Sequence, residues 1–126
     1  MGDLVPQGRR GDLFDPGCPT RQLLDRIGGK WVAMVITVLA EQGELRFAEL
    51  ERRMPGVSHK MLSSTLQQLV ADGLLARRVE PVVPPRVHYQ LTSLGRSLEA
   101  PLAAIREWAE AHMAEVDLAR TTPGPR

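Results

Sequence analysis

The chain has 126 residues, of which 43% are hydrophobic and 25% are charged, and its formal net charge is +1. This length accommodates one compact domain but not two, and the composition excludes a disordered chain. No apolar run approaches the roughly 18 residues of a membrane span, and no N-terminal segment resembles a secretion signal, so we expect a cytoplasmic protein without membrane contact.

The N-terminal third predicts an irregular arm followed by two helices. Residues 1–17 mix glycine, proline and charged residues without periodicity. From Pro19 the apolar residues follow a helical period, which Gly28 and Gly29 interrupt. A second helix is predicted over residues 30–42. It is apolar nearly all round, as expected for the central helix of a core.

The next segment has the pattern of a helix-turn-helix. A short strand over residues 45–47 is predicted to lead into a helix over 48–54, which a proline-glycine turn ends. Ser58 offers an N-cap hydroxyl for a further helix that runs to about residue 72, where a glycine closes it. Two short helices joined by a tight turn are typical of DNA-binding helix-turn-helix proteins.

A β-hairpin is predicted directly after the helix-turn-helix. Residues 74–79 and 86–91 alternate with a period of two, which indicates two strands. The proline-rich residues 81–85 cannot continue a ladder and must form the loop. A hairpin in this place is a wing, so we predict a mainly α fold with a small β-hairpin wing, a winged helix-turn-helix.

A long C-terminal helix is predicted from Thr92 or Ser93, with apolar residues at spacings of three and four. Pro101 lies inside this segment and should bend or restart the helix. A hairpin is too small to bury all the apolar side chains of a helix of this length, so we expect many of them to face a second subunit. The winged helix domain is predicted to span residues 18–118, with 119–126 as a disordered tail.

Positive charge is concentrated in the middle of the chain. Residues 52–96 carry seven basic and two acidic side chains, whereas both flanking segments have more acidic than basic side chains. The polar face of the helix that begins after Ser58 carries groups that suit base edges and phosphates, and arginines lie before this helix and along the hairpin. The predicted DNA-binding residues are Arg46, Arg53, Ser58, His59, Lys60, Ser63, Ser64, Gln67, Arg77, Arg78 and Arg86.

These residues also fit a winged helix that binds a protein partner and not DNA, with the polar helix face merely solvated. The two functions differ in their salt dependence. Contacts between basic side chains and phosphates make affinity fall steeply with ionic strength, whereas apolar contacts to a protein do not.

Four segments of the chain resemble the HxlR-type winged helix-turn-helix regulators. They are CPTRQLLDRIGGKW (18–31), LRFAELERRMPGVSHKMLSSTLQQLVADGLLARR (45–78), PPRVHYQLTSLG (84–95) and REWAEAH (106–112). The resemblance covers about residues 18–113. It implies a regulator, most often a repressor, that dimerises through its first and last helices and binds a near-palindromic operator. It also implies a recognition helix within 58–68 and a wing within 77–86.

Cys18 is the only cysteine of the chain and precedes the first predicted helix, a position that favours the reactive thiolate form. The resemblance adds that some family members carry a redox-sensing thiol here, near the dimer interface. Two interpretations remain open at this point. Oxidation of Cys18 releases DNA, or Cys18 is an inert side chain at the interface.

Trp31, Tyr89 and Trp108 are candidates for the lining of a small-molecule effector pocket between the dimer helices, and the alternative is that they belong to the core. The three histidines lie on different predicted elements without metal-ligand spacing, so no metal site is expected. The sequence has no nucleotide-binding glycine loop, nucleophilic serine motif or plausible carboxylate pair. We therefore predict neither catalytic residues nor a cofactor, and no enzyme activity.

Overall fold

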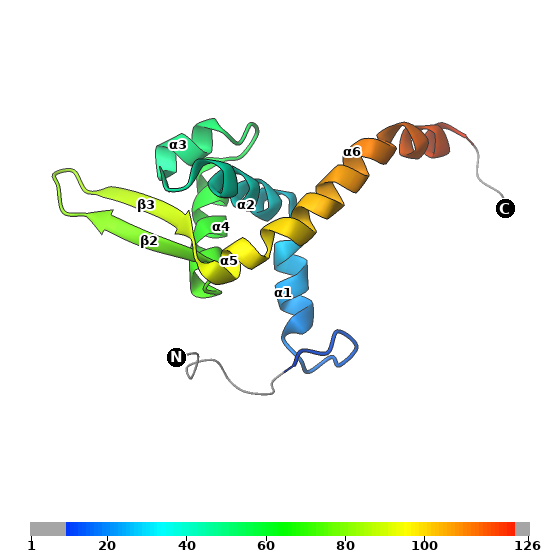
Figure 1. Ribbon diagram of the computed structural model, residues 1–126, viewed down its shortest axis with the longest axis horizontal. Helices are drawn as coiled ribbons and strands as arrows, with labels where there is room; N and C mark the ends of the chain where they lie inside the picture. Colours follow the sequence, from blue (N-terminus) through cyan, green and yellow to red (C-terminus); the bar gives the residue numbers. More distant parts are fainter. Residues whose placement is uncertain (1–9, 123–126) are drawn as a thin grey trace.

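The computed structural model describes residues 10–122, so residues 1–9 of the predicted arm and 123–126 of the predicted tail lie outside it. Its elements are α1 (Thr20–Ile27), α2 (Lys30–Gln42), β1 (Leu45–Arg46), α3 (Phe47–Arg52), α4 (His59–Ala71), β2 (Leu75–Glu80), β3 (Arg86–Leu91), α5 (Ser93–Ser97) and α6 (Glu99–Thr121). The β-hairpin extends to one side of the molecule and α6 to the other (Figure 1). The predicted mainly helical fold with a small hairpin wing is confirmed.

The helices α2 and α3 begin and end close to the predicted residues. α2 spans residues 30–42 as predicted, and Gly43 ends it with a φ of 82°, a conformation that favours glycine. α3 begins at Phe47, one residue earlier than predicted, and also ends two residues earlier. The backbone N–H of Arg46 donates to a carboxylate oxygen of Glu49 at 2.8 Å, which stabilises the start of α3.

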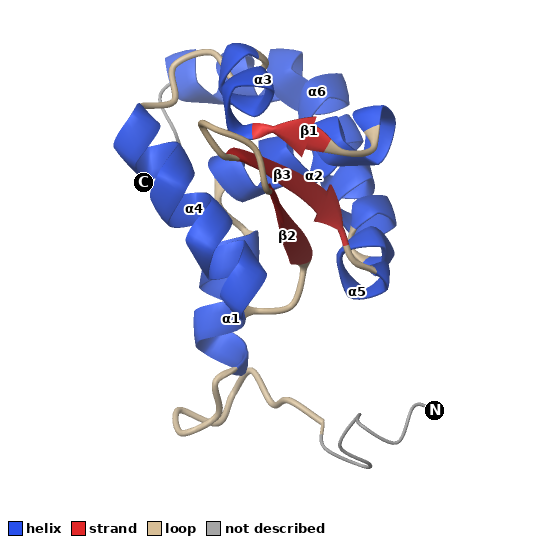
Figure 2. Ribbon diagram, turned by 90° about the vertical axis from the view of Figure 1, so that its left-hand side faces the viewer, coloured by secondary structure: helices blue, strands red, loops and turns tan. Residues whose placement is uncertain are grey.

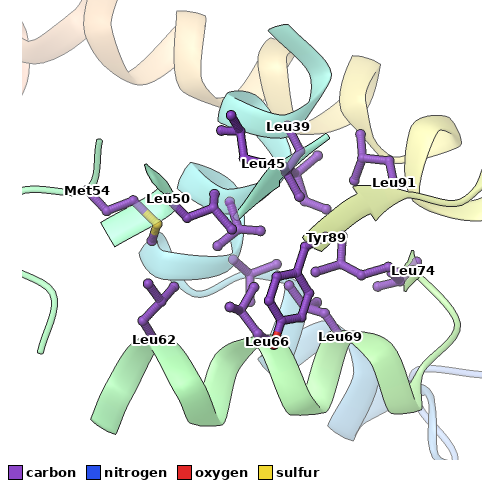
Figure 3. Close-up of a cluster of buried hydrophobic side chains, with 14 of the residues drawn as sticks. Leu39, Leu45, Leu50, Met54, Leu62, Leu66, Leu69, Leu74, Tyr89 and Leu91 are labelled. Carbon is purple, nitrogen blue, oxygen red and sulfur yellow. The ribbon is translucent and has the colours of Figure 1, made fainter. Parts of the chain in front are cut away.

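α4, the second helix of the helix-turn-helix, has one buried and one exposed face. The Ser58 Oγ accepts a hydrogen bond from the backbone N–H of Met61 at 3.0 Å, which confirms the predicted N-cap. On the inner face Leu62, Leu66 and Leu69 are completely buried. Figure 3 shows them against side chains of α2, α3 and the sheet in one core. Each buried leucine contributes about 1.5–3 kcal/mol to folding, so this core packing fixes the position of α4.

The three strands form an antiparallel sheet in the order β1–β3–β2. In the hairpin, Leu75 pairs with Leu91 at one end and Glu80 with Arg86 at the other, and residues 81–85 form the loop as predicted. β1 pairs with the other edge of β3. The sequence predicted the short strand but not its partner, because nothing local to it specifies which edge it joins.

Adjacent residues of β2 lie on opposite faces of this sheet. Arg77 pairs with Tyr89, whose buried side chain marks the face toward α4. Arg78 pairs with His88, which also pairs with Arg46 of β1, so these three lie on the second face. α4 runs alongside the sheet (Figure 2). The two neighbouring arginines of β2 therefore face different surroundings.

The C-terminal helical segment is divided at Leu98 into α5 and α6. Pro101 is the third residue of α6, where its missing N–H removes no intrahelical hydrogen bond, so the predicted restart is confirmed. Leu102 is the one buried residue among those described in α6, and the helix projects beyond the rest of the domain (Figure 1). α6 continues to Thr121, so the predicted end of the ordered domain at residue 118 is three residues too early.

Candidate nucleic-acid interface

The predicted recognition face of α4 lies on the surface of the molecule. His59, Lys60, Ser64 and Gln67 are exposed and Ser63 is half buried. We call these five residues the recognition face. Each carries a hydrogen-bonding side chain that can reach base edges or phosphates. The positive end of the α4 dipole lies at the same end as Lys60, which further favours a polyanion there.

A groove of about 480 Å³ separates α4 from the β-hairpin, and we call it the wing groove. α4 contributes His59, Ser63 and Gln67, which are spaced by four residues and therefore lie along one side of the helix. β2 contributes Arg77 from the facing side. The rest of the lining is mostly apolar and comprises Phe47, Leu66, Val70, Val87 and Tyr89. The structure thus brings four of the predicted DNA-binding residues together around one groove.

Arg78, which was predicted to contact DNA, forms an ion pair with Glu44. Its Nε and Nη2 donate to the two carboxylate oxygens at 3.2 and 2.7 Å. This hydrogen bonding lowers the pKa of the Glu44 carboxyl and raises the pKa of Arg78. Glu44 directly precedes β1, so the pair connects the two edges of the sheet. Sequence reasoning missed Glu44, because its proximity to Arg78 depends on β1 lying against β3.

Arg86 and His88 of the hairpin both lie beside Glu80. The His88 Nε2 is 2.9 Å from one carboxylate oxygen of Glu80, and the Arg86 Nη1 is 3.8 Å from the other. The hydrogen bond with His88 lowers the pKa of the Glu80 carboxyl. The sequence could have indicated this ion pair, because Glu80 and Arg86 flank the predicted hairpin loop. The Glu80 and Glu44 carboxylates together offset much of the positive charge on the second face of the sheet.

The other predicted cations differ in how far they are already neutralised. The Arg46 Nε lies 3.8 Å from a carboxylate oxygen of Glu49. By contrast, Arg53, Lys60 and Arg77 have no acidic side chain within ion-pair distance among the residues that the structure describes. All three are exposed. Their charges are therefore available to an external anion.

Cys18 is half buried where the arm meets α1. Its Sγ accepts a hydrogen bond from the backbone N–H of Asp12 at 3.4 Å and lies 3.1 Å from the Thr20 hydroxyl oxygen. The Nε of Arg21 donates to the Leu13 carbonyl at 2.7 Å, which also folds the arm back onto α1. The thiol thus lies at a junction that belongs to α1, not to the recognition face.

The three predicted effector residues occupy different parts of the chain. Tyr89 is a core residue that lines the wing groove, in agreement with the alternative interpretation that it belongs to the core. Trp31 is half buried, and the Lys30 ammonium lies 4.8 Å from its ring centroid. Trp108 is 59% exposed and stacks on the His112 ring. Trp31 and Trp108 remain predicted effector residues.

The helices α1 and α6 leave large apolar side chains exposed. None of the residues of α1 is buried. We define this α1–α6 surface by its exposed large side chains, which are Leu23, Leu24, Ile105, Trp108, Met113 and Leu118. Beside it, a groove of about 560 Å³ runs between α2 and α6 and is lined mainly by apolar side chains, including Met34, Val38 and Ile105.

Across residues 10–122, no helix is both long and apolar enough to cross a membrane. In the same described part of the chain, no group of three or more histidine, cysteine, aspartate or glutamate residues is placed to hold a metal ion.

The combination of a polar helix face with a hairpin wing matches a known family. The HxlR-like helix-turn-helix family model matches residues 26–117. The chain belongs to this family. As an HxlR-family protein it is a DNA-binding transcriptional regulator, and the family is not an enzyme class.

Individual relatives agree with this family membership. The HTH-type transcriptional regulator YtfH of Escherichia coli (strain K12) is 42% identical over 113 residues, which cover 90% of this chain and 89% of YtfH. The solved structure of the transcriptional regulator YtfH from Salmonella typhimurium is 40% identical and has a TM-score of 0.83, with 90% of this chain and 100% of that chain covered. The redox regulator HypR in its oxidized form is also 40% identical, with a TM-score of 0.66 over 75% of this chain and 96% of HypR.

Proposed function

We propose that this HxlR-family chain represses transcription by binding a near-palindromic operator as a homodimer. The observation that carries the proposal is the recognition face of α4 beside a hairpin whose Arg77 lies across a shared groove. In this proposal α4 enters a major groove, and the hairpin lies against the adjacent backbone or minor groove. Twofold symmetry then places the two half-sites about one helical turn, roughly 10 base pairs, apart.

The proposed dimer forms through α1 and α6. The α1–α6 surface leaves large apolar side chains exposed, such as Ile105 at 65% and Leu118 at 67%. Large apolar side chains that gather on exposed helices often mark an interface with another protein. A second copy presents the same surface, so a twofold contact covers both copies at once. This arrangement leaves the recognition face of each protomer available to DNA.

The proposed control of DNA binding acts through Cys18 or through a small apolar effector. HypR, a structural relative, is a redox regulator. Here the thiols of Cys18 in two protomers give two electrons and two protons to an oxidant such as a quinone and form an intersubunit disulfide. The alternative effector site is the groove between α2 and α6, with Trp108 nearby on α6. Both routes act on helices of the proposed dimer interface.

The testing experiment is a fluorescence-anisotropy titration of the purified protein with DNA from upstream of its own gene, against a scrambled competitor. Specific binding that falls steeply with salt supports the proposed function. Binding to a protein partner with little salt dependence, and no specific DNA binding, would favour the alternative of an interaction module.

Repeating the titration with a thiol oxidant tests the proposed role of Cys18. Equal oxidant responses in the natural protein and in Cys18→Ser would eliminate the sensor.

A further inference from the structure

The two adjacent arginines of β2 have different electrostatic surroundings. Arg78 is bound through two nitrogens to the Glu44 carboxylate on one face of the sheet. Arg77 points to the other face, where it lines the wing groove and has no acidic side chain within ion-pair distance among the described residues. Arg78 therefore already gives two of its five N–H groups to a carboxylate that offsets its charge, whereas Arg77 keeps its charge and all its N–H groups for a ligand.

The ligand chemistry follows from the groups that surround Arg77. Across the wing groove lie the Ser63 hydroxyl and the Gln67 amide, one helical turn apart on α4. A guanidinium fork with nearby neutral donors matches the non-bridging oxygens of a phosphodiester. The rest of the lining is largely apolar, and no carboxylate of residues 10–122 lines the groove to oppose an anion.

We propose that the wing groove is a binding site for one phosphodiester of the DNA backbone, held by Arg77 with Ser63 and Gln67. This inference rests on the proposed function, because the DNA strand that borders the major groove occupied by α4 passes between the helix and the wing. Arg78 has a different role. It is a positioning residue that ties β2 to the residue before β1 through Glu44.

The experiment measures how the affinity of the full-length protein for DNA depends on salt. The probe is a labelled duplex that the natural protein selects from a random-sequence library. Each phosphate contact contributes about 0.9 to the slope of log affinity against log salt concentration, so Arg77→Ala should lower the slope by roughly 1.8 in a dimer. Affinity should fall at least about tenfold. Arg77→Lys should keep the slope.

The matched control is the double variant Arg78→Ala with Glu44→Gln, which removes the ion pair without changing the net charge. We expect an unchanged slope, with equal thermal unfolding confirming that the variant folds. Ser63→Ala and Gln67→Ala remove neutral donors and should weaken binding without changing the slope. A slope that falls with the double variant as much as with Arg77→Ala would overturn the division of roles.

The position of the phosphate is tested by replacing single phosphates of the selected duplex with neutral methylphosphonates. At one position in each half-site, the replacement should lower the DNA affinity of the natural protein at least about tenfold. The same replacement should leave the DNA affinity of the Arg77→Ala variant nearly unchanged. Equal losses for both proteins at every position would refute the proposed site. Failure of the natural protein to select any sequence would instead contradict the proposed function, which keeps the two failures apart.

Discussion

Two exposed helical surfaces of this small protein have opposite chemistry. The α1–α6 surface exposes large apolar side chains, including Ile105 and Trp108, whereas the recognition face of α4 exposes Lys60 and neutral hydrogen-bonding groups. Covering exposed apolar surface with another protein lowers the free energy of association. Exposed cations, by contrast, bind a polyanion most favourably. The two surfaces therefore suit different partners, a second copy at α1 and α6 and DNA at α4.

The largest effect is expected from a substitution that places a charge on the buried face of α4 and so makes this face as polar as the exposed one. Leu62→Asp places a carboxylate in a core site that is completely closed to solvent, which costs several kcal/mol and should unfold the domain. Circular dichroism and thermal unfolding measure this loss. Met61→Asp is the matched control, because the Met61 side chain, next to Leu62 in the sequence, is 46% exposed. A folded Leu62→Asp protein with a natural melting temperature would contradict the assigned core.

The next effect is expected at the α1–α6 surface. Ile105→Glu places an unpaired carboxylate on each side of the proposed dimer contact and should raise the dimer dissociation constant by at least about 100-fold. Analytical ultracentrifugation measures the constant. Val83→Glu makes the same kind of change in the hairpin loop, at a fully exposed side chain outside this surface, and should leave the dimer intact. Dimers of unchanged stability in Ile105→Glu would rule out this interface.

A smaller effect is expected when one cation of the recognition face is removed. Lys60→Ala should weaken DNA binding about tenfold and lower its salt slope, with no change in melting temperature or oligomeric state. Lys30→Ala is the matched control, since this lysine lies over the Trp31 ring and not on α4. Equal DNA affinity and salt slope in Lys60→Ala and the natural protein would remove Lys60 from the interface.

The difference between the two surfaces could be anticipated from sequence where it depends on local pattern. The limits of α2, the hairpin loop, the Ser58 cap and the polar face of α4 were all predicted, because helical and strand periods and capping side chains are encoded by neighbours in the chain. The same periodicity placed apolar residues along α6. Local pattern thus carried most of the fold.

What sequence reasoning missed depends on contacts between distant residues. Glu44 neutralises Arg78 only because β1 joins the free edge of β3, and no local signal encodes that pairing. Residue type alone left Tyr89 open between the core and a pocket, and its position on β3 directs it into the core. The predicted end of the domain was too early, because the helical hydrogen bonds of α6 continue to Thr122.

One ion pair connects the two regions that this comparison separates. The Arg26 Nη1 in the last turn of α1 donates to both carboxylate oxygens of Asp72 at 2.9 and 2.8 Å, and Asp72 is the C-cap residue of α4. Both side chains are partly buried, at 30% and 21% exposure. Although α1 has no buried residue, this pair helps to hold it against α4.

The smallest predicted effect follows from this connection. Arg26→Ala and Asp72→Ala should each lower the free energy of unfolding by no more than about 1 kcal/mol, since partly exposed ion pairs are screened by solvent. Each should also weaken DNA binding a few-fold, by loosening the orientation of α4 relative to the dimer helices. A double-mutant cycle, with unfolding and DNA affinity measured on the same four proteins, separates the two effects. Coupling in DNA affinity that exceeds the coupling in unfolding would show that the pair orients α4, because a purely stabilising contact affects binding only through the folded fraction. No coupling in either measurement would mean that α1 and α4 are held independently.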